Sequence, residues 1–525
     1  MFAGVGLLAP FQTPTSADGT PRKVPPPTPV RFPQCTPQTE DRPLSSKVPL
    51  PTLLQTIHRP ADLQLSHFEA LGVHVIPDAS PRDIIPDPSF LPPFEEWLAI
   101  PPEELEEKTI ASKKRLSNGN LSPGIQTYIE RRNELSIDNT PAFRTIRRIP
   151  PPPGEAAVRL GNAYEFFRNL ELFSGYWPDT SLPTKPDEPS SDPGPSSDDG
   201  KGKEESALHL QTHHLIGTGS QTPAEYRQQL LTAFIKLVAY DFGCNVSFSR
   251  CEPRLHLTPP SPSPPSHFNS AVAFIYRTPT DRASARSGIV EGPLAAVSCR
   301  PTTGFTTPNE ERLDLAREVV AVLLTAQQRA REGKSEKRFG EGKWWTSTPR
   351  WGGGPGGPIG SEADRTEEPI LELGPGAEKL PSSISEMKRA IGGIGGSSSS
   401  KRSKKGTAQI YENYRKLLPP SSTWDRKARY SAIGKPKDVG ADDVFLVSTL
   451  NHHVCIVRAR VPESLLRVLD GEEIEWERMV MWRSRWFDLF LKEDRIQGME
   501  LIWGMMAWLM RSESPADTDK MDVSR

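Results

Sequence analysis

The run GPLAAVSCRP, residues 292–301, is the most informative part of this chain. It is a short apolar run between a Gly-Pro pair and a further proline, which is typical of a buried β-strand. The segment Thr307-Pro308-Asn309-Glu310 follows, a capping box with proline at the first helical position. It predicts a helix to about Arg331, and a buried strand that leads into a long helix indicates an α/β protein.

The elements around this strand extend the pattern. Thr222-Pro223-Ala224-Glu225 is a second capping box and predicts the start of another helix. Apolar or alternating runs predict strands at 245–249, 271–277, 293–300, 444–449, 453–460 and 479–482, and helical periodicity predicts helices at 156–173, 223–241, 309–331 and 496–510. This order predicts an α/β fold, in which helices flank a small mixed sheet with an α-β-β-β-α-β-like core.

Composition divides the chain into ordered and disordered parts. Of 525 residues, 55 are proline and 39 glycine, and only 35% are hydrophobic, against the usual ~45–50%. Such a chain cannot bury enough apolar surface along its whole length to offset the entropy of ordering it. We expect a disordered Pro-rich segment at 1–90, helical segments at 91–177, a disordered linker at 178–207, a discontinuous core at 208–332 and 407–511, a disordered insertion at 333–406 and a disordered tail at 512–525.

Charge and cysteine content narrow the class of protein. The 64 basic and 66 acidic residues nearly cancel, so net charge does not support a nucleic-acid partner. The five cysteines contain no CxxC pair, which favours a reducing compartment. The most apolar run, Leu501–Met510, is far shorter than the ~20 residues of a membrane span. We therefore expect an intracellular protein of the nucleus or cytoplasm, with no membrane partner.

Three stretches carry a resemblance to a known family. Residues 270–276 (SAVAFIY) resemble the second core strand of PD-(D/E)XK nuclease-like proteins, and 292–301 with the helix after it resemble the third strand and its helix. Residues 442–460, the segment 480–482 and the closing apolar helix resemble the C-terminal part of that family. The chain is most similar to a large fungal group of these proteins, and the resemblance implies their α-β-β-β-α-β core.

The resemblance also implies where catalytic residues would stand. In the family, an Asp on the second strand and a Glu-x-Lys on the third hold Mg²⁺ and orient the attacking water. At those positions this chain has Ala273, Ser298 and Arg300, so no catalytic set is intact. Asp281 and Glu291 are weak substitutes in expected loops. We predict no metal site and no cofactor, with Mg²⁺ required only if a rearranged site is active.

Three functional hypotheses follow. The first is a probably inactive nuclease-like domain that acts as a binding or interaction module. The second is a divergent Mg²⁺-dependent nuclease with a rearranged site, and the third is a scaffold with disordered arms that is unrelated to nucleases. The third is disfavoured if the strands at 271–277 and 293–300 are adjacent and the helices at 223–241 and 309–331 pack on the sheet.

Short motifs outside the core suggest partners. Lys401, Arg402, Lys404 and Lys405 form a basic patch that suits nuclear import or nucleic acid, or is a solvated charge run. Pro-rich arms, such as the one that follows Arg147, match the spacing of SH3 ligands and could recruit proteins.

Two further residue types argue for structural roles. We expect His452 and His453 in a surface turn, since adjacent strand residues face opposite ways and cannot easily share a metal. We expect Cys299 to be a small core residue.

Overall fold

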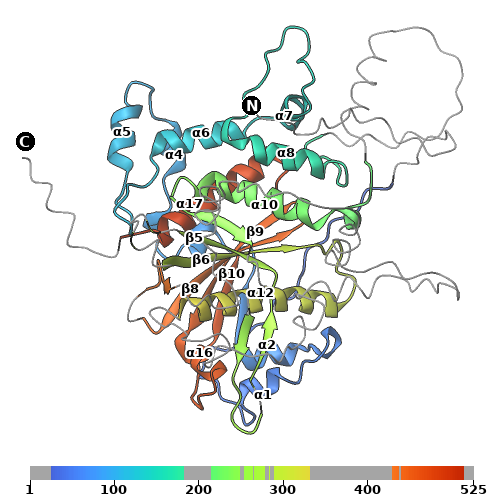
Figure 1. Ribbon diagram of the computed structural model, residues 1–525, viewed down its shortest axis with the longest axis vertical. Coiled ribbons are helices and arrows are strands. Elements are labelled where there is room, and N and C mark those ends of the chain that lie inside the picture. Colours follow the sequence, from blue (N-terminus) through green and yellow to red (C-terminus); the bar gives the residue numbers. More distant parts are fainter. Residues whose placement is uncertain are drawn as a thin grey trace, which may run out of the picture.

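The computed structural model describes residues 25–182, 215–248, 254–263, 265–277, 279, 283, 289–330, 429–436 and 439–512. Figure 1 shows three layers in this part of the chain, with a twisted sheet between two groups of helices. The basic patch at 401–405, the expected insertion at 333–406 and Asp281 lie outside the described residues.

A mixed sheet forms the middle layer, in the order β1-β10-β9-β8-β6-β5-β2. Neighbours pair antiparallel except for β6 with β8 and β1 with β10, which are parallel. The strands of this path are β1 (Val73–Ile76), β2 (Asn245–Phe248), β5 (Val272–Arg277), β6 (Ile289–Arg300), β8 (Ala441–Leu450), β9 (His453–Pro462) and β10 (Met479–Arg483). Short strands β7 (Arg429–Ser431) and β11 (Phe487–Asp488) pair with β6 and β9, and β3 (Arg254–Leu257) with β4 (Ser266–Asn269) forms a separate hairpin.

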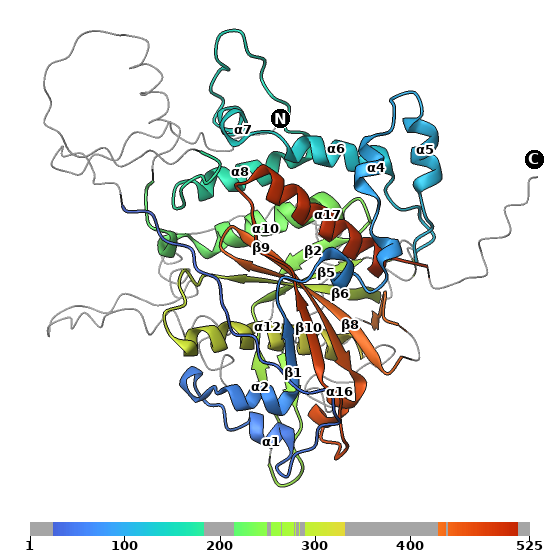
Figure 2. The ribbon, with the colours of Figure 1, turned by 180° about the vertical axis from the view of Figure 1, so that it is seen from behind.

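Helices cover both faces of the sheet, as Figures 1 and 2 show from opposite sides. On one face lie α10 (Ala224–Ala239) and α17 (Lys492–Leu509), beneath α6 (Ile125–Leu135), α7 (Asn139–Ile146) and α8 (Tyr164–Phe173). On the other lie α12 (Pro308–Arg329), α1 (Leu50–Leu54), α2 (Leu65–Leu71) and α16 (Glu463–Leu469). The shorter α3 (Pro81–Ile84), α4 (Phe94–Leu98) and α5 (Leu105–Ser112) belong to the N-terminal part. No helix in the described ranges is long and apolar enough to cross a membrane.

The predicted α/β class is confirmed. Strands β5 and β6 are adjacent, with Ala273 opposite Val297, and α10 and α12 pack on opposite faces of the sheet. The elements α10, β2, β5, β6, α12 and β8 follow the expected α-β-β-β-α-β order, with the β3–β4 hairpin inserted. The parallel β6–β8 pair joins the two halves of the core across a long stretch of sequence.

The prediction that 1–90 holds no regular structure is wrong for the described residues 25–90. Helices α1, α2 and α3 form there, and Figure 2 shows β1 as a blue strand beside β10. Pro51 and Pro81 lie in the first turns of α1 and α3, where a missing amide donor is not costly. The strand β1 contains no proline, and Val73 pairs with Met479.

Helix α12 is the most enclosed element. Its expected apolar stripe is buried, but so is every residue from Leu313 to Arg329. The outer side is covered by the β3–β4 hairpin, where the amide of Gln327 exchanges two hydrogen bonds with the backbone of His256, at 3.0 and 2.9 Å. At its C-terminal end, Arg329 makes a bidentate ion pair with Asp442 on β8, at 2.7 and 3.0 Å.

The two predicted capping boxes have different outcomes. Thr307 caps α12, since its hydroxyl accepts a hydrogen bond from the Glu310 amide at 3.3 Å and Glu310 accepts one from the Thr307 amide at 2.9 Å. The box at Thr222 is wrong, because this hydroxyl donates to Gly219 and accepts from the indole of Trp177. Local spacing cannot reveal such a distant competitor for the hydroxyl.

The α12 cap gives a test of the fold. Thr307→Ala removes the acceptor for one amide of the first turn, and we expect the free energy of unfolding to fall by about 1 kcal/mol in a urea titration. Thr307→Ser keeps the hydroxyl and should remain close to wild type. An alanine variant as stable as wild type would show that the cap contributes nothing.

Candidate functional site

The three positions matched to the nuclease motif do not converge on one site. Ala273 pairs with Val297 and faces α10, whereas Ser298 pairs with Val272 and faces α12. Arg300 lies two residues after Ser298 and shares its face. The expectation that Ala273, Ser298 and Arg300 mark one catalytic cluster is therefore wrong, because the register of β5 against β6 places the first on the opposite side of the sheet.

Arg300 lies in a buried ionic cluster between α12 and the sheet. Its guanidinium contacts Asp314 at 2.6 Å and Glu318 at 3.1 Å, both on α12. It also donates to the Ser448 hydroxyl on β8 at 2.6 Å. Glu318 pairs in addition with Arg483 of β10. We call Arg300, Asp314, Glu318, Ser448 and Arg483 the α12 ion network, and their side chains link α12 to three strands.

Burial and charge act against each other in this network. Burial raises the pKa of Asp314, and the charge of Arg300 only partly offsets this. Burial alone would also raise the pKa of Glu318, but Arg483 and Arg300 outweigh it and lower this pKa below its ordinary value. If Glu318 bound a divalent cation instead, buried guanidinium groups would lose their partner, which is strongly unfavourable. The network therefore suits a structural role better than metal-dependent hydrolysis.

The remaining sequence candidates are also occupied or dispersed. Glu291 forms an ion pair with Arg277, its cross-strand partner. Cys299 faces the α10 side, and burial raises the pKa of its thiol to about 12, so it is not a thiolate nucleophile at neutral pH. Arg147, at the head of one Pro-rich motif, pairs with Glu171 at 2.7 Å and so turns toward the protein.

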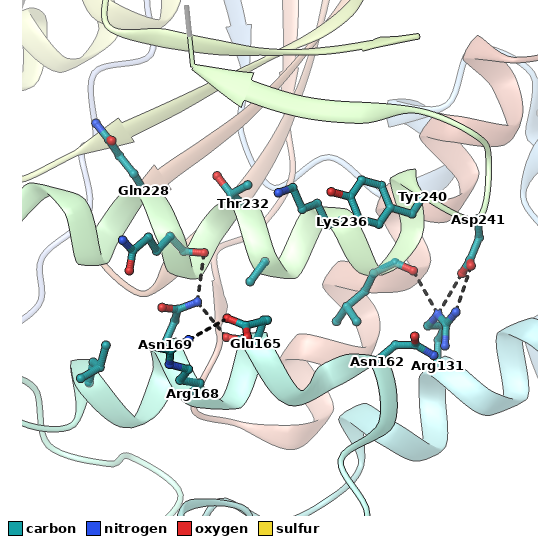
Figure 3. A pocket seen from close by; sticks show the side chains of 14 residues that line it. Arg131, Asn162, Glu165, Arg168, Asn169, Gln228, Thr232, Lys236, Tyr240 and Asp241 are labelled. Carbon is teal, nitrogen blue, oxygen red and sulfur yellow. Dashed lines mark hydrogen bonds and ion pairs between the residues drawn. The ribbon is translucent and has the colours of Figure 1, made fainter. Parts of the chain in front are cut away.

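The surface carries a polar groove between α8 and α10, with a volume of about 710 Å³ (Figure 3). At one end Arg131 of α6 makes two hydrogen bonds of 2.9 Å with the Asp241 carboxylate and a third, of 3.1 Å, with the Leu237 carbonyl. Asn169 of α8 donates to the carbonyl oxygens of Glu165 and Gln229, which fixes its amide in the groove wall.

The chemistry of the groove suits binding. Its labelled lining in Figure 3 consists of amide, hydroxyl and charged side chains: Arg131, Asn162, Glu165, Arg168, Asn169, Gln228, Thr232, Lys236, Tyr240 and Asp241. None of the lining residues is histidine or cysteine. Three cations face two carboxylates, so the local net charge is +1, too small to select polyanions. The sequence analysis missed this groove because α8 and α10 come from segments assigned to different domains.

The expectation for the two histidines is wrong. His452 and His453 are buried, 1% and 7% exposed, and their ring centroids lie 4.1 Å apart. His452 belongs to the tight turn between β8 and β9, in which Asn451 has a φ of 55°, so strand alternation does not separate the two rings. Together with Asp488 they form a group whose potential metal-ligand atoms lie within 4.8 Å of one another.

The α12 ion network gives the second test. Glu318→Gln should lower the free energy of unfolding by about 3–5 kcal/mol, because it removes the partner of two buried guanidinium groups. Glu104→Gln, in an exposed ion pair with Lys108, should change it by less than about 1 kcal/mol. Denaturant unfolding measures both variants, and equal small effects would refute a structural role for the network.

Comparisons with protein-family models, with curated proteins and with solved structures returned no match to this chain. The resemblance to nuclease-like proteins therefore stays a prediction from the sequence. The functional argument rests on the residues of the ionic cluster and of the groove.

Proposed function

We propose that this chain is a non-catalytic binding module built on a nuclease-like core, and that the groove between α8 and α10 holds a protein partner. The engagement of Arg300 carries the first part of the proposal. It is the only charged side chain among the three motif positions, it is 2% exposed, and it is directed at Asp314, Glu318 and Ser448.

A working nuclease would need acidic groups that can reach a metal ion and a phosphate. The carboxylates nearest Arg300 are fully buried and face guanidinium groups. Hard divalent cations such as Mg²⁺ need several oxygen ligands and keep bound waters, for which a closed ionic cluster has no room. The same contacts therefore favour binding over hydrolysis.

The groove favours an extended polypeptide as the partner. Side-chain amides both donate and accept hydrogen bonds, as the backbone of a peptide requires, and Asn162, Gln228 and Gln229 supply such groups along the lining. The aromatic ring of Tyr240, with the Lys236 ammonium 5.5 Å from its centroid, offers an apolar surface at one end. The near balance of charge does not favour nucleic acid.

A nuclease assay tests the absence of catalysis. Purified full-length protein, incubated with DNA and Mg²⁺ or Mn²⁺, should cleave no more than a buffer control, because no acidic metal site is free on the sheet. The Glu291→Ala and Glu104→Ala variants should behave alike. Cleavage by the wild type that Glu291→Ala abolishes and Glu104→Ala retains would overturn the proposal.

Site-specific photo-crosslinking tests the groove. A photoreactive amino acid placed at Thr232, inside the groove, should give discrete crosslinked proteins in cells of the source organism. The same amino acid at Ile110 on α5, 66% exposed and outside the groove, is the matched control. Loss of the Thr232 products in a Gln228→Arg background would support docking in the groove. Identical products from both positions, or none from Thr232, would contradict it.

A further inference from the structure

The buried group of His452, His453 and Asp488 lies apart from the groove and from the α12 ion network. His452 comes from the β8–β9 turn, His453 begins β9, and Asp488 ends β11. The register of β11 against β9 places Asp488 directly opposite His453, and the tight turn brings His452 to the same place. Three separate backbone positions thus direct ligand-type side chains to one point.

The distances suit a metal ion better than direct hydrogen bonds. His452 Nε2 lies 3.8 Å from Asp488 Oδ1, and His453 Nε2 lies 3.6 Å from Asp488 Oδ2. Both separations are too long for hydrogen bonds. Ligand atoms that share a tetrahedral zinc ion, with bonds of about 2.0–2.1 Å, lie about 3.4 Å apart. Small side-chain adjustments would bring the three groups into coordination.

The imidazole nitrogens lack partners in the structure. Both ring nitrogens of His452 and Nδ1 of His453 are buried with no hydrogen bond. Aromatic rings pack around His452, with centroids of Trp177, Phe490 and Phe173 at 4.9, 5.0 and 6.3 Å. A buried imidazole in an apolar shell without any partner is unfavourable, and a bound cation would satisfy it.

The carboxylate is held in place by its own contacts. The Thr180 hydroxyl donates to Asp488 Oδ2 at 2.7 Å, and the backbone amide of Phe490 donates to Oδ1 at 2.9 Å. Such outer contacts orient metal-binding carboxylates in known sites. A purely structural pair of histidines would instead be expected to hydrogen-bond to this carboxylate, and the distances above show that it does not.

We infer that His452, His453 and Asp488 bind one divalent transition-metal ion. Two imidazoles and one carboxylate are the donors that Zn²⁺ and Fe²⁺ accept, whereas Mg²⁺ and Ca²⁺ prefer oxygen ligands alone. The ion would tie the β8–β9 turn to β11. The site does not depend on the proposed binding function, because it shares no residue with the groove.

Titration of the full-length, chelator-treated protein with Co²⁺ tests this site, since Co²⁺ bound in such a site has a visible absorption spectrum. We expect one Co²⁺ per chain, displaced by Zn²⁺ and not by excess Mg²⁺. Asp488→Asn and His453→Gln should weaken binding at least 10-fold. His267→Gln removes a buried histidine of the β3–β4 hairpin and should bind like wild type.

Thr180→Val keeps all three ligands, so it remains informative if the ligand variants do not fold. It should weaken binding about 10- to 100-fold while the circular dichroism spectrum stays native. Folded wild-type protein that binds neither Co²⁺ nor Zn²⁺ would overturn the inference. So would a loss of binding in His267→Gln as large as that in His453→Gln.

Discussion

The ionic contacts of Glu318 with Arg300 and Arg483 hold the centre of the molecule together. Glu318 lies on the buried helix α12, Arg300 ends β6 and Arg483 ends β10. Charges in such a place are tolerated only if each finds a partner, so the helix cannot shift against the sheet without exposing an unpaired ion. The position of α12, and with it the two-sided packing of the sheet, depends on these contacts.

The same contacts shape the functional conclusion. The face of β6 that carries Ser298 and Arg300 is closed by α12, and Ala273 lies on the other face. Side chains in the region where a nuclease would need open acidic groups serve instead to attach a helix. Binding chemistry is left to the α8–α10 groove, and metal chemistry to the β8–β9 turn, both formed only after distant segments pack together.

Local signals predicted the local features and could not predict the long-range ones. The Thr307 cap, the hairpin of β8 and β9 and the long helix α12 follow from spacing and apolar pattern. The Glu318–Arg483 contact spans 165 residues, and no local pattern encodes it. The register of β5 against β6 is equally non-local, since a shift by one residue would have moved Ala273 to the face of Ser298. His452 was misplaced because the turn, rather than the strand, begins at Asn451.

A double-mutant cycle on Arg300 and Glu318 tests the central claim most directly. Arg300→Met, Glu318→Gln and the double variant would be compared with wild type in the free energy of unfolding. If Arg300 is the structural counter-ion of α12, the coupling energy should be at least about 1.5 kcal/mol, as for close buried charge pairs. A coupling energy near zero would contradict the account and would leave Arg300 available for another role.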